Sequence, residues 1–137
     1  MNREVHYEFT KRWAVDEGFS EEDAETIAAA DWAVDDIHNV YESLYNKGYH
    51  FAWLGAYRRA KLLFGRAVDG RDLVALGEAL HCIQDAIGHG QLGHIVHWEG
   101  IDRWERRGPR VKERIERRSR ALLAAYQLHA GSRPDSS

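Results

Sequence analysis

Apolar side chains that return every three to four residues dominate the sequence, and this spacing restricts the chain to helical folds. One row covers a full helix face in the segment 71–89: Leu73, Leu76, Leu80, Ile83 and Ile87. A second row with similar spacing lies near the end of the chain: Val111, Ile115, Leu122 and Tyr126. We find no convincing alternation of apolar and polar residues with period two, the pattern of a half-buried strand. The sequence therefore predicts an all-α protein.

Capping and breaking residues divide the chain into a compact bundle of about five helices. Ser20 has the side chain of an N-cap, Gly70 is expected to close a helix, and Pro109 fits the first position of the last helix. We predict one helical domain over 1–130 and a flexible tail over 131–137. The expected helices run over about 3–16, 20–37, 52–68, 71–88 and from 109 onward.

The length of 137 residues is that of one domain with a core of its own. No apolar run is long enough to cross a bilayer, so no transmembrane segment is expected. The first residues, MNREVHYEF, contain no apolar stretch of a signal peptide. Cys82 is the single cysteine and has no internal disulfide partner. These features favour a cytoplasmic protein.

The segment around His81 is the most informative for chemistry. His81 and Asp85 are four residues apart on an expected helix, so their side chains stack on one face and can bind one metal ion or bridge two. That face lies away from the leucine row, so we do not expect simple core positions. Gly77, one turn before His81, leaves room for another helix. His89 lies one turn after Asp85, beside glycines that let the backbone turn it toward the same site.

Further candidate ligands lie on other expected helices, and a helical bundle can bring them together in its interior. Asp31 and Asp35 share one face of the second helix, in the apolar segment 27–34 and just after it, where burial costs free energy unless a cation pairs with the carboxylates. His6 belongs to the first helix, and His50 lies at the entry to the third. Taken alone, each of these residues also fits a helix-surface acid or a satisfied histidine, and the His81–Asp85 spacing also fits a surface pair or an N–H to carboxylate contact. Taken together, the residues predict a metal site.

Charge is distributed unevenly along a chain whose net charge is −3. Residues 1–50 carry 12 acidic and 4 basic side chains, whereas nine basic residues lie within 103–120. Such a segment can attract an anionic substrate. Glutamates are interleaved with the arginines at helical spacing, so a solvated helix face is the simpler interpretation. The first interpretation would apply if the arginines face the metal, and the second if they face solvent.

The segment Leu80-His81-x-x-Gln84-Asp85-x-x-x-His89 resembles the Leu-His-x-x-x-Asp core of the bacterial zinc-dependent phospholipase C family and the related single-strand-specific zinc nucleases. Weaker similarities are VHYEFT at 5–10, AADWAVD at 29–35 and YHF at 49–51. The order of the histidines and aspartates along residues 1–97 is also similar to that of the family.

The resemblance implies a helical bundle around two or three zinc ions and the hydrolysis of phosphate esters by a metal-bound water. His50 and His81 would hold one zinc, and Asp85 would bridge it to a second, which His6 would also hold. His89 would belong to a third site. Asp31 or Asp35 would orient or deprotonate the attacking water.

The family's later His-x-x-x-Glu pair has no counterpart in this chain, so a reduced, two-metal site is expected. His94 and His97 are three residues apart and would supply the missing ligands if their segment is helical; otherwise they are loop histidines. Imidazole and carboxylate ligands suit zinc, and other divalent metals remain open. Asp36, Glu78 and Gln84 are expected to accept hydrogen bonds from the ligating histidines.

Two alternatives keep the same residues. In the first alternative, the residues hold a metal in a binding protein that has no catalytic activity. In the second, they belong to a specialised metabolic enzyme, a cyclase or lyase, that uses the metals as Lewis acids. A di-iron centre ranks lower, because Glu78-x-x-His81 is a single copy of a motif that such bundles use twice. The sequence leaves phospholipid, nucleic acid and small phosphoesters open as substrates, and it does not predict the oligomeric state.

Overall fold

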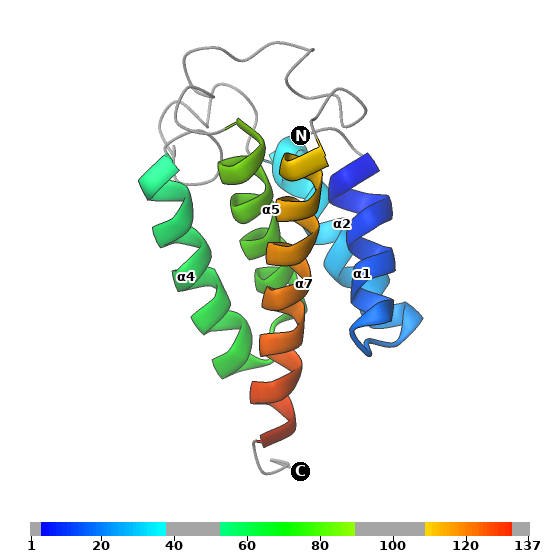
Figure 1. Ribbon diagram of the computed structural model, residues 1–137. Helices are drawn as coiled ribbons and strands as arrows, with labels where there is room; N and C mark the ends of the chain where they lie inside the picture. Colours follow the sequence, from blue (N-terminus) through cyan, green and yellow to red (C-terminus); the bar gives the residue numbers. More distant parts are fainter. Residues whose placement is uncertain (1–3, 38–52, 90–108, 133–137) are drawn as a thin grey trace.

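The computed structural model describes residues 4–37, 53–89 and 109–132, and within them the side chains of 7–34, 57–87 and 109–131. These residues form a helical bundle (Figure 1). No described residue lies in a strand, so the predicted all-α helical bundle is confirmed for this part of the chain. A π-helical segment, η1 (Glu4–Phe9), comes first, followed by α1 (Thr10–Asp16), α2 (Glu21–Ile37), α4 (Trp53–Gly70), α5 (Leu73–His89) and α7 (Pro109–Ser132).

The turn between α1 and α2 is built by Gly18 and Ser20. Gly18 adopts φ 98°, a left-handed conformation that glycine reaches without steric cost. This lets the N–H of Phe19 donate to the carbonyl of Ala14 at 3.0 Å, which closes α1 in a Schellman motif. The hydroxyl of Ser20 then accepts the N–H of Asp23 at 3.1 Å, so the predicted N-cap of the second helix is confirmed.

The turn between α4 and α5 departs from the sequence prediction. The left-handed residue is Arg71, with φ 52°, and not the neighbouring Gly70, which is still helical. The N–H of Asp72 donates to the carbonyl of Ala67 at 2.9 Å across this turn. Asp72 also caps α5, because its carboxylate accepts the N–H of Ala75 at 3.1 Å. The tertiary position of α5 thus places an arginine where a glycine was expected to close the helix.

The directions of the helices determine which helix ends lie together. In Figure 1, α1, α4 and α7 run one way along the bundle, and α2 and α5 run the other way. The start of η1, the end of α2 and the end of α5 therefore lie at one end of the molecule, with the starts of α4 and α7. We call this the open end, because the chain leaves the described helices there at residues 37, 53, 89 and 109.

α5 is the central helix of the described bundle, since it packs against α2, α4 and α7. Leu76 and Leu80 of the predicted leucine row are fully buried. His81 and Asp85 are also buried, with 0% and 1% of their surface exposed. Both residues are buried because a helix covered on three sides keeps little free surface, and they lie among the buried polar residues and not in the apolar core.

Gly77 sets the distance between α5 and α2. A Cβ atom built on it would lie 2.4 Å from the carbonyl oxygen of Ile27 and 2.9 Å from the backbone nitrogen of Asp31. Any side chain at this position would collide with the backbone of α2. The prediction that Gly77 leaves room for another helix is confirmed, and this close approach carries the candidate site.

Apolar packing fills the rest of the interior. One cluster joins α1, α2, α4, α5 and α7 and includes Trp13, Ile27, Leu76 and Leu123. A smaller cluster, which includes Val34, Leu63 and Cys82, lies between α2, α4 and α5. None of the described helices is both long enough and apolar enough to cross a bilayer.

Candidate functional site

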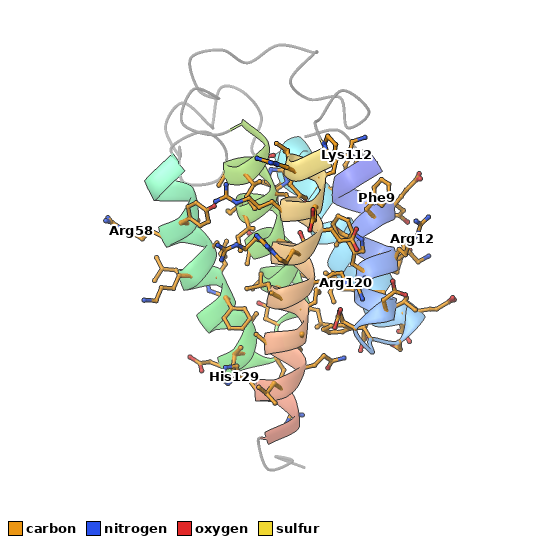
Figure 2. All side chains as sticks on the ribbon, in the orientation of Figure 1. Phe9, Arg12, Arg58, Lys112, Arg120 and His129 are labelled. Atoms are coloured by element: carbon orange, nitrogen blue, oxygen red, sulfur yellow. The ribbon has the colours of Figure 1, made fainter. Side chains whose placement is uncertain are left out.

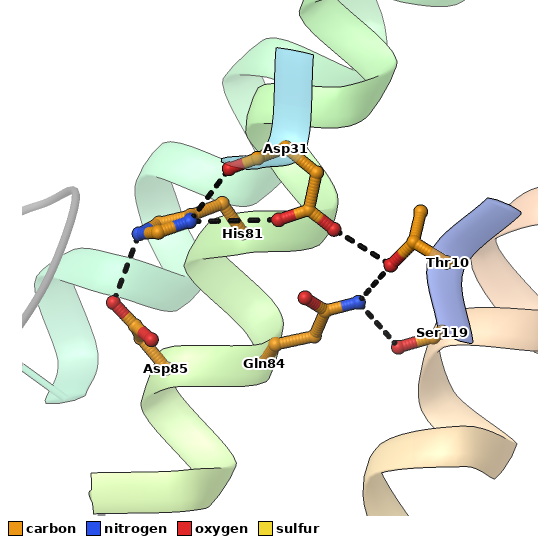
Figure 3. Close-up of polar contacts among 6 residues, drawn as sticks. All are labelled: Thr10, Asp31, His81, Gln84, Asp85 and Ser119. Carbon is orange, nitrogen blue, oxygen red and sulfur yellow. Dashed lines mark hydrogen bonds and ion pairs between the residues drawn. The ribbon is translucent and has the colours of Figure 1, made fainter. Parts of the chain in front are cut away.

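Six polar side chains are buried in the described core, and they form a single connected network (Figure 3). Buried polar groups cost free energy unless each finds a partner, so their meeting in one place is a specific feature of this fold. They come from α1, α2, α5 and α7: Thr10, Asp31, His81, Gln84, Asp85 and Ser119.

His81 is held at both ring nitrogens. Its Nδ1 lies 2.9 Å from the backbone carbonyl oxygen of Asp31. A carbonyl only accepts hydrogen bonds, so Nδ1 carries the proton and donates it. The same nitrogen lies 3.5 Å from Oδ1 of the Asp31 carboxylate. On the other side of the ring, Nε2 lies 3.0 Å from Oδ2 of Asp85 (Figure 3).

The contact between His81 and Asp85 is an ion pair when the ring carries a second proton, on Nε2. With Nδ1 protonated, a neutral ring presents a lone pair at Nε2. A carboxylate oxygen at 3.0 Å would repel that lone pair inside the protein. Either a proton shared by the two groups or a metal ion bound by both removes the repulsion. Two ligands on one tetrahedral zinc lie about 3.3 Å apart, so the observed spacing is within a few tenths of an ångström of a metal-binding pair.

A second part of the network orients Asp31. The hydroxyl of Thr10 donates to Oδ2 of Asp31 at 2.8 Å. The side-chain amide of Gln84 donates to the oxygen of Thr10 at 2.9 Å and to the hydroxyl oxygen of Ser119 at 3.2 Å. One amide nitrogen carries two hydrogens, so it supplies both bonds. The chain of contacts runs from α7 through α5 and α1 to Asp31, and from Asp31 to His81.

The structure brings together three of the predicted site residues: Asp31, His81 and Asp85. The backbone of His6 lies on η1, that of Asp35 on α2 and that of His89 at the last residue of α5, all toward the open end. The side chains of these three residues lie outside the described residues. His50, His94 and His97 also lie outside the described residues.

Thr10 and Ser119 are members of the network that sequence reasoning missed. Both are single hydroxyl residues within helical segments, and nothing near them in the sequence points to a site. Gln84 was expected as a hydrogen-bond acceptor for a histidine. It acts instead as a donor to the two hydroxyls, and the acceptor for His81 is the main chain of Asp31.

Cys82 and the described part of the arginine-rich segment give no sign of a role in the site. Cys82 is buried, and burial raises the pKa of its thiol far above the ordinary value, which fits the prediction that it serves packing. In the described part of the arginine-rich segment, Arg110, Arg114 and Arg117 are exposed to solvent. By the criterion set out above, this part gives no support for an anionic substrate at the metal; residues 103–108 lie outside the described residues.

Comparisons of the chain with protein-family models, with curated proteins and with solved structures find no match. Among the described side chains, no group of three or more His, Cys, Asp and Glu is arranged to hold a metal ion. His81 and Asp85 supply two donor atoms, and Asp31 turns its carboxylate toward Nδ1 and Thr10. The described side chains therefore supply two possible metal ligands, fewer than the three protein ligands of a catalytic zinc site.

Proposed function

We propose that this chain is a metal-dependent hydrolase of phosphate esters whose metal centre includes His81 and Asp85. The observation that carries the proposal is the arrangement of His81. The Nδ1 proton is donated to a main-chain carbonyl, which leaves Nε2, 3.0 Å from the carboxylate of Asp85, as the ring nitrogen that would bind a metal. Metal-binding histidines in proteins are oriented in this way through the ring nitrogen that does not bind the metal.

The location of the pair also supports the proposal. Asp85 lies nearer the open end than His81, and His89 follows it by one further turn of α5. Asp35 lies one turn beyond Asp31 on α2, in the same direction, and His6 lies on the neighbouring η1. We propose that the remaining ligands come from His6 and His89, with His50, His94 and His97 as further candidates.

The choice of phosphate esters rests on the resemblance of the segment around His81 and Asp85 to the zinc-dependent phospholipase C family. A bound divalent metal, most suitably zinc, lowers the pKa of a bound water and stabilises the charge on a phosphoryl group. The residues of this chain have separate roles. Asp31 orients His81, Thr10 orients Asp31, and Asp35 is the residue we assign to orienting the attacking water.

Metal content tests the proposal first. We expect protein purified without added metal or chelator to contain two or more equivalents of metal, and Asp85→Ala to lose them. His129→Ala, which changes an exposed histidine on α7, is the matched control and should keep the metal. A folded wild-type protein that contains no metal, and takes up none when zinc is supplied, would overturn the proposal.

Turnover is the second step of the test. The wild-type protein should hydrolyse chromogenic phosphate mono- or diesters, and Asp85→Ala should not. A second candidate function is a metal-binding protein without turnover. The burial of both His81 and Asp85 favours it, because a closed site has no position for substrate. Stoichiometric metal combined with no hydrolysis of any phosphoester would select this candidate.

A further inference from the structure

A row of three arginines runs along the outer face of α7. Arg110, Arg114 and Arg117 are spaced four and three residues apart, so their side chains leave the helix on one side. All three are exposed. At 1.5 Å per residue, the row extends about 10 Å along the helix axis. It begins at the first turn of α7, which lies at the open end of the bundle (Figure 1).

The three arginines line a surface cavity of about 350 Å³, together with Glu113. No ion pair within 4.0 Å joins their guanidinium groups to a carboxylate of the described residues. Arg120, which is labelled in Figure 2 and lies one turn further along α7, differs in this respect. Its Nε lies 2.8 Å from Glu17, and its Nη1 lies 3.2 Å from Glu116. The row thus presents three positive charges against the one negative charge of Glu113 in the same cavity.

We propose that Arg110, Arg114 and Arg117 bind the phosphate backbone of a nucleic-acid strand. The planar guanidinium group carries five N–H donors and grips phosphate oxygens in pairs. A polyanion with phosphates at regular intervals can engage several guanidinium groups of one row at once. This inference concerns binding alone and does not rest on the proposed hydrolase activity.

Charge segregation lets a protein of net charge −3 bind a polyanion. Helix α7 carries six basic and two acidic side chains, a net charge of +4. Residues 1–50, in contrast, carry a net charge of −8. At moderate salt, acidic groups that lie more than about 10 Å from the bound strand repel it little.

An anionic membrane surface is the less suitable partner. Binding to a bilayer needs large apolar side chains that enter the headgroup region beside the basic ones. The large apolar side chains that are exposed in the described residues lie elsewhere: Val15, Leu62, Val74 and Leu128. None of them belongs to the first half of α7, so no large exposed apolar side chain of the described residues lies beside the three arginines.

The test measures binding of the full chain to a short fluorescent single-stranded oligonucleotide by anisotropy, in EDTA and at low salt. Three contacts predict a slope of about −2 for log K against log salt, so the affinity falls about 20-fold between 50 and 200 mM salt. The triple variant Arg110→Gln, Arg114→Gln and Arg117→Gln should lose most of the affinity and of the slope.

The matched control removes three exposed cations from another helix, α4: Arg58→Gln, Lys61→Gln and Arg66→Gln. Arg58 points away from the bundle in Figure 2. This variant should keep at least half of the wild-type affinity. Equal losses in the two triple variants, or no binding by the wild type, would overturn the proposal. So would binding to phosphatidylserine vesicles without binding to the oligonucleotide. Because EDTA removes metal, none of these outcomes depends on the site at His81.

Discussion

Nδ1 of His81 donates a hydrogen bond to the main-chain carbonyl of Asp31, 2.9 Å away and fifty residues earlier in the sequence. The contact depends on Gly77, one turn before His81 on α5. Because Gly77 has no side chain, α5 approaches α2 until a Cβ at that position would be 2.9 Å from the backbone nitrogen of Asp31. Gly77 thus sets the spacing between α2 and α5 that lets His81 reach the carbonyl of Asp31. The packing of these two helices therefore determines the orientation of the histidine ring.

We expect Gly77→Ala to lower the free energy of unfolding by about 2 kcal/mol or more, because its methyl group would overlap the carbonyl of Ile27 and cannot move away from it. Urea denaturation followed by circular dichroism measures the change. Gly65→Ala is the matched control. Gly65 lies inside α4 with nothing within 4 Å of an added Cβ, so the change should stabilise the protein by about 0.5–1 kcal/mol. Equal effects in the two variants would show that α2 and α5 do not pack this closely.

Removing His81 should also destabilise the protein when no metal is present. His81→Ala leaves Asp85 and the carbonyl of Asp31 buried without their partner, which we expect to cost about 3 kcal/mol in EDTA. His129→Ala, which removes a more exposed ring beside Phe64, should change stability by less than about 0.5 kcal/mol. A cost below about 1 kcal/mol for His81→Ala would mean that the network contributes little without metal.

Much of the fold could be predicted from local sequence signals. The spacing of Leu76 and Leu80 gave a core-facing helix, and Ser20 and Pro109 marked the starts of two others. Arg71 shows where this reasoning stops. Its left-handed conformation depends on how α5 packs back on α4, which outweighed the preference of Gly70 for closing a helix. Local preferences of about 1 kcal/mol are readily overridden by packing.

Less of the site could be predicted. The four-residue spacing of His81 and Asp85 is local, and it correctly placed both side chains on one face of α5. The partners of the network are not local, because Thr10 and Gln84 are 74 residues apart and Gln84 and Ser119 are 35 apart. Nothing in the sequence near a lone threonine or serine reveals which helix it will face, so these contacts emerge only when the helices are assembled.

In the network around Gln84, removing one partner of a buried hydrogen bond should cost more stability than removing both partners. Gln84→Leu keeps the volume but removes the donor to Thr10 and Ser119, which should cost about 1–3 kcal/mol of stability. Adding Ser119→Ala to that variant removes one acceptor that has lost its donor, so it should recover part of the loss. If the double variant is destabilised by the full sum of the two single changes, Gln84 and Ser119 are not coupled.

Cys82 should be unreactive in the native protein. Burial raises the pKa of its thiol, so the nucleophilic thiolate is scarce at neutral pH, and the side chain is not accessible to reagents. We expect no reaction with Ellman's reagent over an hour in buffer at pH 8, and one equivalent of thiol after unfolding in guanidinium chloride. Rapid reaction of the folded protein would show that the helices around Cys82 open readily.

The pKa of Glu25, on α2, tests whether its contacts with Tyr7 and Lys11 form in solution. The hydroxyl of Tyr7 donates to its carboxylate, and Lys11 pairs with it at 3.0 Å. Both contacts hold the pKa of Glu25 below its ordinary value of 4.5, with the hydrogen bond from Tyr7 as the largest cause. A lowered pKa means that the ionised group stabilises the fold above pH 4.5, and that this contribution is lost as pH falls through the pKa in the folded state. Tyr7→Phe should therefore raise the pKa of Glu25 toward 4.5, as followed by the carboxyl carbon signal in an NMR titration. Tyr57→Phe, on α4, should leave the titration of Glu25 unchanged, and an unchanged titration in Tyr7→Phe would show that the contact does not form in solution.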